Sequence, residues 1–371
     1  MNTNNIKSFA REARLLLLEG VLQRLKYWGF QENGANTENL QTTQGGYIFR
    51  STPYTDVSVP PKWHKLKAKL KNKQDVNDVK EEASYTWFNR LMAIKILEAN
   101  GYIPKQLGYT EGSRTPLIVQ NAKRGEHNIT NRAEKELLIE FLKEDKDEEA
   151  FALLITNLCH TNTLLHDIFG RIDDYTEILF PQNVLKIDGL VDVINSDDII
   201  DEDFKEVELI GWLYQFYISD KKDEVFKGFE KNIKARAEDI PAATQIFTPK
   251  WIVKYMVENT VGKIYLDFEP DSDLRDQMKY LVDTSTALSA GNESEDVITS
   301  EAKQSLITDL TQLTLIDPAA GSGHILVTGF ELLFKMYREA GYNAEKAVQN
   351  ILQHNLYGLD IDDRAMQLAR F

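Results

Sequence analysis

A glycine turn beside an acidic residue is the part of the sequence whose spacing points most directly to chemistry. The stretch is "TLIDPAAGSGHIL", Thr314 to Leu326. Apolar residues lead into Asp317, and Gly321 and Gly323 follow just before a segment with helical periodicity. Glycine lets a ligand approach the backbone closely, and a helix N-terminus carries a positive dipole end. We therefore expect a ligand-binding turn for a nucleotide, a dinucleotide or S-adenosylmethionine.

Two of these ligand classes need residues that the turn lacks. A phosphate loop needs a lysine after its glycines, and none follows Gly323. The dinucleotide pattern needs a third glycine at position 326, where the sequence has Leu326. A carboxylate at the strand tip can accept a hydrogen bond from an ammonium group, and the small Ala319 and Ala320 leave room for a ligand. These residues favour S-adenosylmethionine.

Two other segments carry residues that fit the same ligand. "YGLDIDD" ends a predicted strand at Asp360, whose carboxylate can accept both hydroxyls of a ribose, and Ile361 offers an apolar face to an adenine. "TQIFTPKWIVKYMVEN" reads as a helix with Thr248 as N-cap and Pro249 at its first position, where a ligand carboxylate can bind. Each segment alone has an ordinary structural explanation. The three in this order favour a function.

The elements around the turn predict a β-α-β unit. We expect a strand at Leu313–Ile316, a helix at about His324–Glu339, a second helix capped by Asn343, and a strand ending in "LYGLDID". Further upstream the periodicity is mainly helical, from Ile6 to about Tyr27 and through "ASYTWFNRLMAIKILEANG" and "ELIGWLYQFYISDKKDEVF". The aromatic residues of the last segment are expected in the core. Residues 32–60 read as loops and short strands.

Composition places the chain in an ordinary soluble class. Hydrophobic residues make up 42% and charged residues 27%, no apolar run has the length of a membrane span, and no signal-peptide core begins the chain. The single cysteine, Cys159, excludes a disulfide framework within the chain, and His160 and His166 with Asp167 lack the spacing of a metal site, so we expect no metal. A cytoplasmic location without membrane contact is the default expectation.

The net charge of −15 is unevenly distributed, so it does not exclude a DNA contact in one part of the chain. Residues 1–130 carry 19 Lys and Arg against 12 Asp and Glu, so this part is basic. On a strand, alternate lysines would share one face and could each neutralise a DNA phosphate, whereas on a helix they would scatter. A solvated loop is the equally weighted alternative. The candidate DNA-binding residues are Lys65, Lys67, Lys69 and Lys71.

The same motifs resemble those of a known enzyme class. "IDPAAGSGHIL" resembles the D-P-A-C-G-S-G motif of γ-class adenine-N6 DNA methyltransferases, with Ala320 in place of the cysteine. "IFTP" resembles the first cofactor motif of that class, and "GLDID" its ribose-binding acid. "IKSFAREARLLLLEGV", "ELIGWLYQFYISDKKDEVF" and "ATQIFTPKWIVKYMVENTVG" resemble the N-terminal part of the PglX methyltransferases of BREX phage-defence systems. The resemblance covers essentially the whole chain.

The resemblance implies a cofactor, S-adenosylmethionine, and a set of residues that bind it. Thr248 would contact the methionine carboxylate, Asp317 would lie nearest the ammonium, Asp360 would hold the ribose, and Ile361 would pack on the adenine. The complete implied set is Phe247, Thr248, Asp317, Pro318, Ala319, Gly321, Gly323, Asp360 and Ile361. DNA is the implied partner, together with other BREX proteins or a phage-encoded inhibitor.

One motif of the resembled class is missing from the sequence. Its catalytic Asn-Pro-Pro-Tyr/Phe, which receives the flipped adenine, does not occur in these 371 residues. We therefore expect an α/β chain with a mostly helical domain at 1–235 and the beginning of a Rossmann-like methyltransferase domain at 236–371, with an acidic connector at about 268–308. This part alone is expected to be inactive. The alternative is a non-catalytic DNA- or protein-binding module of a defence complex.

Overall fold

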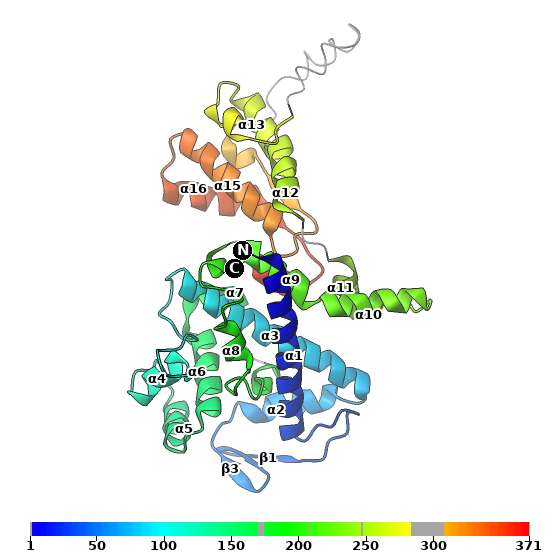
Figure 1. The fold of residues 1–371 in the computed structure, drawn as a ribbon, viewed down its shortest axis with the longest axis vertical. Coiled ribbons are helices and arrows are strands. Elements are labelled where there is room, and N and C mark those ends of the chain that lie inside the picture. The colour runs from blue at the N-terminus through cyan, green and yellow to red at the C-terminus, as the bar shows by residue number, and fades with distance from the viewer. Residues whose placement is uncertain (1, 170–173, 207, 246–247, 283–307, 371) are drawn as a thin grey trace. The chain divides into compact units, whose positions relative to one another are not determined.

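The computed structural model shows a mainly helical chain with two small sheets (Figure 1). It describes residues 2–169, 174–206, 208–245, 248–282 and 308–370. The chain divides into two compact units, one ending at Asp223 and one running from Glu224 to Arg370. Helices and sheets together confirm the expected α/β class. The domain ranges 1–235 and 236–371 and the Rossmann-like character of the second domain stay predictions.

Three helices form the centre of the first unit. They are α1 (Thr3–Tyr27), α3 (Lys73–Ala99) and α9 (Glu208–Tyr217), and α1 packs against both of the others (Figure 1). Most of the apolar residues that recur at helical spacing along α1, from Phe9 to Leu25, are buried. The predicted helix from Ile6 to Tyr27 is therefore confirmed, and its apolar stripe is the face that holds the unit together.

The aromatic segment after residue 207 is two helices, whereas the sequence predicts one. The structure divides it at Ile218 into α9 and α10 (Ser219–Glu230), and the carbonyl of Ile218 accepts from the N–H of Lys222 in the first turn of α10. Tyr214 and Tyr217 are buried, with ring centroids 5.9 and 5.1 Å from that of Tyr85. The core interpretation holds for these two residues, and the other two aromatic residues of α9 are half-buried.

The remaining elements of the first unit surround this centre. A three-stranded antiparallel sheet has the order β1-β2-β3, with Leu40 opposite Phe49. The short strands agree with the turn-rich composition of residues 32–60. The strands are β1 (Leu40–Thr43), β2 (Gly46–Phe49) and β3 (Thr52–Tyr54), and the helices are α2 (Val59–Lys69), α4 (Leu117–Lys123), α5 (Arg132–Lys143), α6 (Asp147–Thr161), α7 (Thr163–Phe169) and α8 (Leu190–Ile194). Short 3-10 turns are η1 (Glu177–Leu179) and η2 (Asp203–Lys205).

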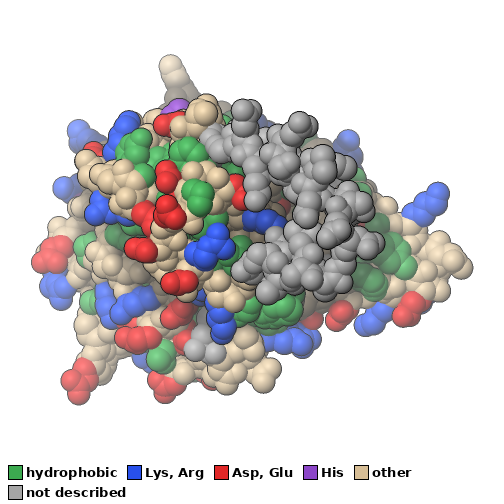
Figure 2. Space-filling view, turned by 90° about the horizontal axis from the view of Figure 1, so that it is seen from above, with side chains coloured by type: hydrophobic (Ala, Val, Ile, Leu, Met, Phe, Trp, Pro, Cys, Tyr) green, Lys and Arg blue, Asp and Glu red, His purple; other side chains and the backbone are tan. Residues whose placement is uncertain are grey.

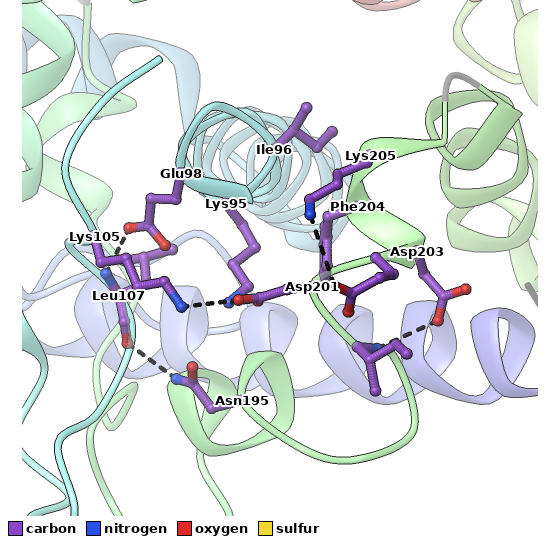
Figure 3. Close-up of polar contacts among 12 residues, drawn as sticks. Lys95, Ile96, Glu98, Lys105, Leu107, Asn195, Asp201, Asp203, Phe204 and Lys205 are labelled. Atoms are coloured by element: carbon purple, nitrogen blue, oxygen red, sulfur yellow. Dashed lines mark hydrogen bonds and ion pairs between the residues drawn. The ribbon is translucent and has the colours of Figure 1, made fainter. Parts of the chain in front are cut away.

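A polar cluster at the end of α3 holds two loops in place (Figure 3). The Asp201 carboxylate accepts hydrogen bonds from Lys95 at 2.8 Å and from Lys105 at 2.9 Å. Buried Glu98 accepts from two backbone N–H groups, those of Gln106 at 2.5 Å and Leu107 at 2.7 Å. One carboxylate thus bridges two lysines from different segments, and the other satisfies a loop backbone that has no sheet or helix partner.

Acid should weaken the first unit through Asp201. The hydrogen bonds from Lys95 and Lys105 lower the pKa of Asp201 to about 2. A carboxyl group with a depressed folded-state pKa stabilises the fold above its unfolded pKa, and this contribution is lost as the pH falls from about 4 toward 2. Asp201 is about one-third exposed, so screening reduces the effect to about 1 kcal/mol. We expect Asp201→Asn to lower the free energy of unfolding by that amount at pH 6.

The measurement is urea unfolding at several pH values, from about 6 down to 2.5. Burial raises the pKa of Glu98, which contributes with the opposite sign, so the variant is compared with the wild type at each pH. The difference between the two proteins should shrink as the pH falls. A difference that does not change with pH would show that Asp201 acts by packing and not by charge.

The second unit contains a parallel pair of strands and the helices packed on it. The apolar core includes Val253, Val257, Leu333, Met336 and Ile351. The helices are α11 (Ile240–Thr244), α12 (Lys250–Val257), α13 (Lys263–Phe268), α15 (His324–Glu339), α16 (Ala344–Asn350) and α17 (Asp363–Arg370), with π-helical turns at η4 (Glu258–Gly262) and η8 (Ile351–Asn355). Short 3-10 turns are η3 (Ala237–Asp239), η5 (Asp273–Gln277) and η7 (Leu310–Gln312). The strands are β4 (Leu315–Asp317) and β5 (Leu356–Gly358).

The β-α-β unit predicted from the sequence is confirmed. β4 and β5 are parallel, with Leu315 opposite Leu356 and Asp317 opposite Gly358. α15 begins and ends where the sequence predicts, and the side chain of Asn343 caps α16. The first strand lies slightly later than the predicted 313–316. Most of the expected acidic connector, residues 283–307, lies outside the described ranges.

A fully buried asparagine holds the approaches to the two strands together. Asn355 ends η8, just before β5, and its side-chain amide donates to the carbonyls of Leu310 and Leu313, each at 2.7 Å. Its carbonyl oxygen accepts from the hydroxyl of buried Tyr337 on α15 at 3.0 Å. This side chain therefore joins the segment before β4, the segment before β5 and the helix between them.

Charges of both signs are interspersed on the face drawn in Figure 2. Among the residues coloured there, lysine and arginine side chains lie between aspartate and glutamate side chains and form no continuous basic surface. A mixed surface of this kind favours solubility and gives little electrostatic attraction for a polyanion.

Candidate binding site at the ends of two parallel strands

The glycine turn connects the end of β4 to the start of α15. Gly321 has a φ of 53° and Gly323 a φ of 85°, both in the left-handed region that favours glycine. A Cβ atom on Gly321 would have no neighbour within 4 Å, so the space beside the turn is open there. A Cβ on Gly323 would lie 3.0 Å from that of Ala369 in α17. One glycine thus borders open space, and the other permits close helix packing.

Asp317 lies at the carboxyl end of β4 and is buried. Its carboxylate accepts a hydrogen bond from the N–H of Ala319 at 3.0 Å. Its backbone carbonyl accepts from the N–H of Leu359 at 2.9 Å, and the N–H of Ala320 donates to the Leu359 carbonyl at 2.9 Å. The turn after β4 is therefore joined by backbone bonds to the segment that follows β5.

Asp360 is brought directly onto the glycine turn. Its carboxylate accepts from the N–H of Gly321 at 2.7 Å and from the N–H of Asp362 at 2.8 Å. Each carboxylate oxygen can accept more than one hydrogen bond, so these two contacts leave capacity for a ligand. The sequence places the two acids 43 residues apart, and the structure places them at the ends of adjacent strands around one turn.

The other predicted residues differ in how the structure places them. Pro318 and Ala319 are exposed on the turn, and Ile361 is 70% exposed beside Asp360. Thr248 is half-buried just before α12, and Phe247 lies outside the described residues. The predicted capping of α12 is wrong. The helix begins at Lys250 with Pro249 at the N-cap position, so Thr248 lies one residue too early to cap it, and no side chain does.

A histidine that sequence analysis missed lies between two of the predicted segments. His324 is the first residue of α15, and its Nδ1 lies 3.0 Å from the backbone carbonyl oxygen of Thr248. A carbonyl oxygen can only accept, so Nδ1 carries the hydrogen and donates it. Nothing in the spacing of His324 indicates this contact, because its partner is 76 residues away in the sequence.

The candidate DNA-binding lysines lie on or just after a helix, not on a strand. Lys65 and Lys69 share a face of α2 one turn apart, and Lys67 lies on another face over the Trp63 ring, 5.0 Å from its centroid. Lys71 follows the helix. The arrangement on one strand face is therefore wrong, because Pro60 and Pro61 start a helix here.

Two of the residues considered in the sequence have ordinary polar partners in the structure. Lys69 donates to Glu82 at 2.8 Å and to the hydroxyl of Tyr175. His160 Nε2 lies 3.2 Å from a carboxylate oxygen of Glu177, which also pairs with Lys62. His160 therefore has a structural partner.

Within the described ranges, none of the helices combines the length and apolar character needed to cross a bilayer.

Comparison with known proteins identifies the relatives of the chain. No protein-family model matches it. The adenine-specific methyltransferase BrxX of Escherichia coli O9:H4 (strain HS) is 36% identical over 383 residues, which cover 100% of this chain and 30% of the relative. The adenine-specific methyltransferase PglX of Lacticaseibacillus casei (strain Zhang) is 34% identical over 392 residues, which cover 100% of this chain and 32% of the relative. Over its whole length, the chain is therefore homologous to part of two proteins named as adenine-specific methyltransferases, BrxX and PglX.

The resemblance of the sequence motifs to PglX-type proteins is thereby confirmed. The chain spans about a third of the length of BrxX and PglX. A putative type II restriction enzyme and methyltransferase of Methanocaldococcus jannaschii is 24% identical over 318 residues, which cover 78% of this chain and 24% of that protein.

Proposed function

We propose that the chain forms the first part of the S-adenosylmethionine site of an adenine-specific DNA methyltransferase. The observation that carries the proposal is the bond between the Asp360 carboxylate and the N–H of Gly321, which gathers two strand-end acids around one glycine turn. Ligands of open α/β sheets bind at the carboxyl ends of the strands, where both acids lie. The names of BrxX and PglX as adenine-specific methyltransferases support this assignment.

The acceptor groups of the site fit S-adenosylmethionine better than a phosphate. Two carboxylates at the turn would repel phosphate groups but would accept hydrogen bonds from an ammonium group and from ribose hydroxyls. In the proposed site Asp317 accepts from the ammonium, Asp360 from the ribose, and Ile361 covers the adenine. Pro318, Ala319 and Gly321 line the open side of the turn, Gly323 permits the close packing of α17 beside it, and Thr248 faces the methionine carboxylate. Phe247, which completes the implied set, lies outside the described residues. When bound, S-adenosylmethionine supplies the methyl group on its sulfonium.

The target would be the N6 amino group of adenine in DNA, and the proposed biological role is BREX phage defence in the cytoplasm. Other BREX proteins and a phage-encoded inhibitor are the proposed protein partners. The sequence contains no Asn-Pro-Pro-Tyr/Phe motif to receive the adenine, so the isolated 371-residue chain should not methylate DNA. The test is transfer of labelled methyl groups to duplex DNA by the full-length protein and by the isolated chain. Labelled DNA from the isolated chain, or none from the full-length protein, would contradict the proposal.

We further propose that the lysines of α2 contact DNA phosphates. Lys65, Lys67 and Lys71 are exposed, whereas Lys69 is neutralised by Glu82. Changing the first three to Glu in the full-length protein should weaken duplex binding at least about tenfold at 50 mM salt and should reduce the slope of log K against log salt by roughly one for each lysine. Fluorescence anisotropy with labelled duplexes at several salt concentrations measures both.

The matched control makes the same change in net charge on another helix, α5, and just after it. It changes Lys135, Lys143 and Lys146 to Glu. These lysines are exposed on α5 and just after it. This control should keep most of the salt dependence, because only the lysines at α2 release counterions from DNA in the proposal. Equal losses in the two triple variants would mean that overall charge and not α2 attracts the DNA. The single variant Lys69→Ala should have little effect on binding.

A further inference from the structure

We infer that His324 is a positioning residue of the proposed cofactor site, an inference that rests on the proposed function. Two parts of that site are distant in sequence: the segment at Thr248 and the glycine turn at residues 318–323. His324 directly follows the turn, and its side chain donates from Nδ1 to the Thr248 carbonyl at 3.0 Å. The bond fixes one wall of the site relative to the other.

The local structure explains why a side chain is needed at this position. Thr248 precedes α12, and no side chain caps that helix. α12 packs against α15 through Val253 and Val257, but these residues lie farther along the helix and do not fix the segment before it. Gly323 precedes α15 without a side-chain cap of its own. The imidazole of His324 therefore supplies a side-chain hydrogen bond between the two helix starts.

His324 is half-buried, which limits the orientations of its ring. Its backbone carbonyl accepts from the hydroxyl of Thr328 at 3.1 Å, and the N–H of Val327 donates to the Gly323 carbonyl at 2.9 Å, so the residue lies in a formed first helical turn. A ring held by such a turn loses little entropy when it donates to Thr248. Its role is to hold Thr248 in place before a ligand arrives, which reduces the ordering cost of binding.

The geometry of the hydrogen bond gives a matched pair of variants. The side-chain amide of asparagine can place an N–H near the position of Nδ1, whereas the amide of glutamine places it near the position of Nε2. His324→Asn should therefore keep the contact with the Thr248 carbonyl, and His324→Gln should lose it. Alanine removes the donor altogether.

The experiment is calorimetric titration of the full-length protein and its three variants with S-adenosylmethionine. His324→Ala and His324→Gln should raise the dissociation constant about fivefold to tenfold, the effect of one lost hydrogen bond, and His324→Asn should restore it to within about twofold of the wild type. The KM for the cofactor should rise with little change in kcat, because the bond orders the site and touches no reacting atom. Melting temperatures of all variants control for folding.

The outcomes separate this inference from the proposed function. If the wild type binds S-adenosylmethionine and all three variants bind it equally well, the positioning role of His324 is refuted and the site remains. Equal weakening in the Asn and Gln variants would also refute it, because the donor position would then be irrelevant. If the alanine variant does not fold, the comparison of His324→Asn with His324→Gln still tests the positioning role of His324. A wild type that does not bind the cofactor would overturn both proposals.

Discussion

Replacing Asp317 by alanine in the full-length protein is expected to weaken S-adenosylmethionine binding by about 10- to 100-fold. A hydrogen bond between a carboxylate and an ammonium group contributes roughly 1.5–3 kcal/mol, which corresponds to this range. Asp317 is buried at the end of β4, where a carboxylate is only weakly screened by solvent. Isothermal titration calorimetry measures the change directly. The rate of DNA methylation at low cofactor concentration should fall in proportion.

Alanine also removes the acceptor of the Ala319 N–H, so a second variant is needed to separate binding from folding. Asparagine at position 317 keeps an oxygen for that N–H but loses the negative charge. Asp317→Asn should therefore keep nearly the wild-type melting temperature and still lose most of the cofactor affinity. Wild-type affinity in the asparagine variant would show that the charge of Asp317 does not meet the ammonium group.

The largest expected effect on stability comes from Asn355. Asn355→Ala removes the donor to the carbonyls of Leu310 and Leu313 and the acceptor of the Tyr337 hydroxyl, all in a buried region. An unsatisfied buried polar group costs about 1–3 kcal/mol, and partial relaxation of three such groups gives an expected loss of about 3–5 kcal/mol in the second unit. Hydrogen exchange of peptides that contain β4 and β5 measures this loss locally.

Two neighbouring variants serve as controls for Asn355. Gln353 is exposed on the same turn, so Gln353→Ala should change stability by less than about 0.5 kcal/mol. Tyr337→Phe removes one of the three bonds and should cost about 1 kcal/mol.

Asn355→Ala should also weaken cofactor binding, because Asp317 and Asp360 depend on the alignment of β4 and β5. Exchange rates that are unchanged in β4 and β5 would contradict the role given to Asn355.

The parts of the second unit that could be predicted are those with strong local signals. The helix at His324–Glu339 follows from its apolar period and the glycines before it, and Asn343 is a favoured N-cap residue. The parallel pairing of β4 and β5 follows from the helices between them, because parallel strands need a crossover. The acids at the strand ends could be identified for the same reason.

The contacts that hold the site together could not be predicted, because their partners are distant in sequence. Nothing near Asn355 indicates that its amide bonds to carbonyls more than 40 residues earlier, and the same holds for His324 and Thr248. For the lysines at α2, a local pattern was present but pointed to the wrong element. Their alternation fits a strand, but Pro60 and Pro61 and the buried Trp63 and Leu66 determine a helix. Tertiary packing decided between two local patterns.

A crystal structure of the full-length protein with S-adenosylhomocysteine, the product of methyl transfer, would show whether the two strand-end acids bind the cofactor. We expect the amino nitrogen of the ligand within hydrogen-bond distance of the Asp317 carboxylate and the ribose hydroxyls on the Asp360 carboxylate, beside the open turn at Gly321. A ligand bound elsewhere, with no contact to Asp317 or Asp360, would contradict this expectation.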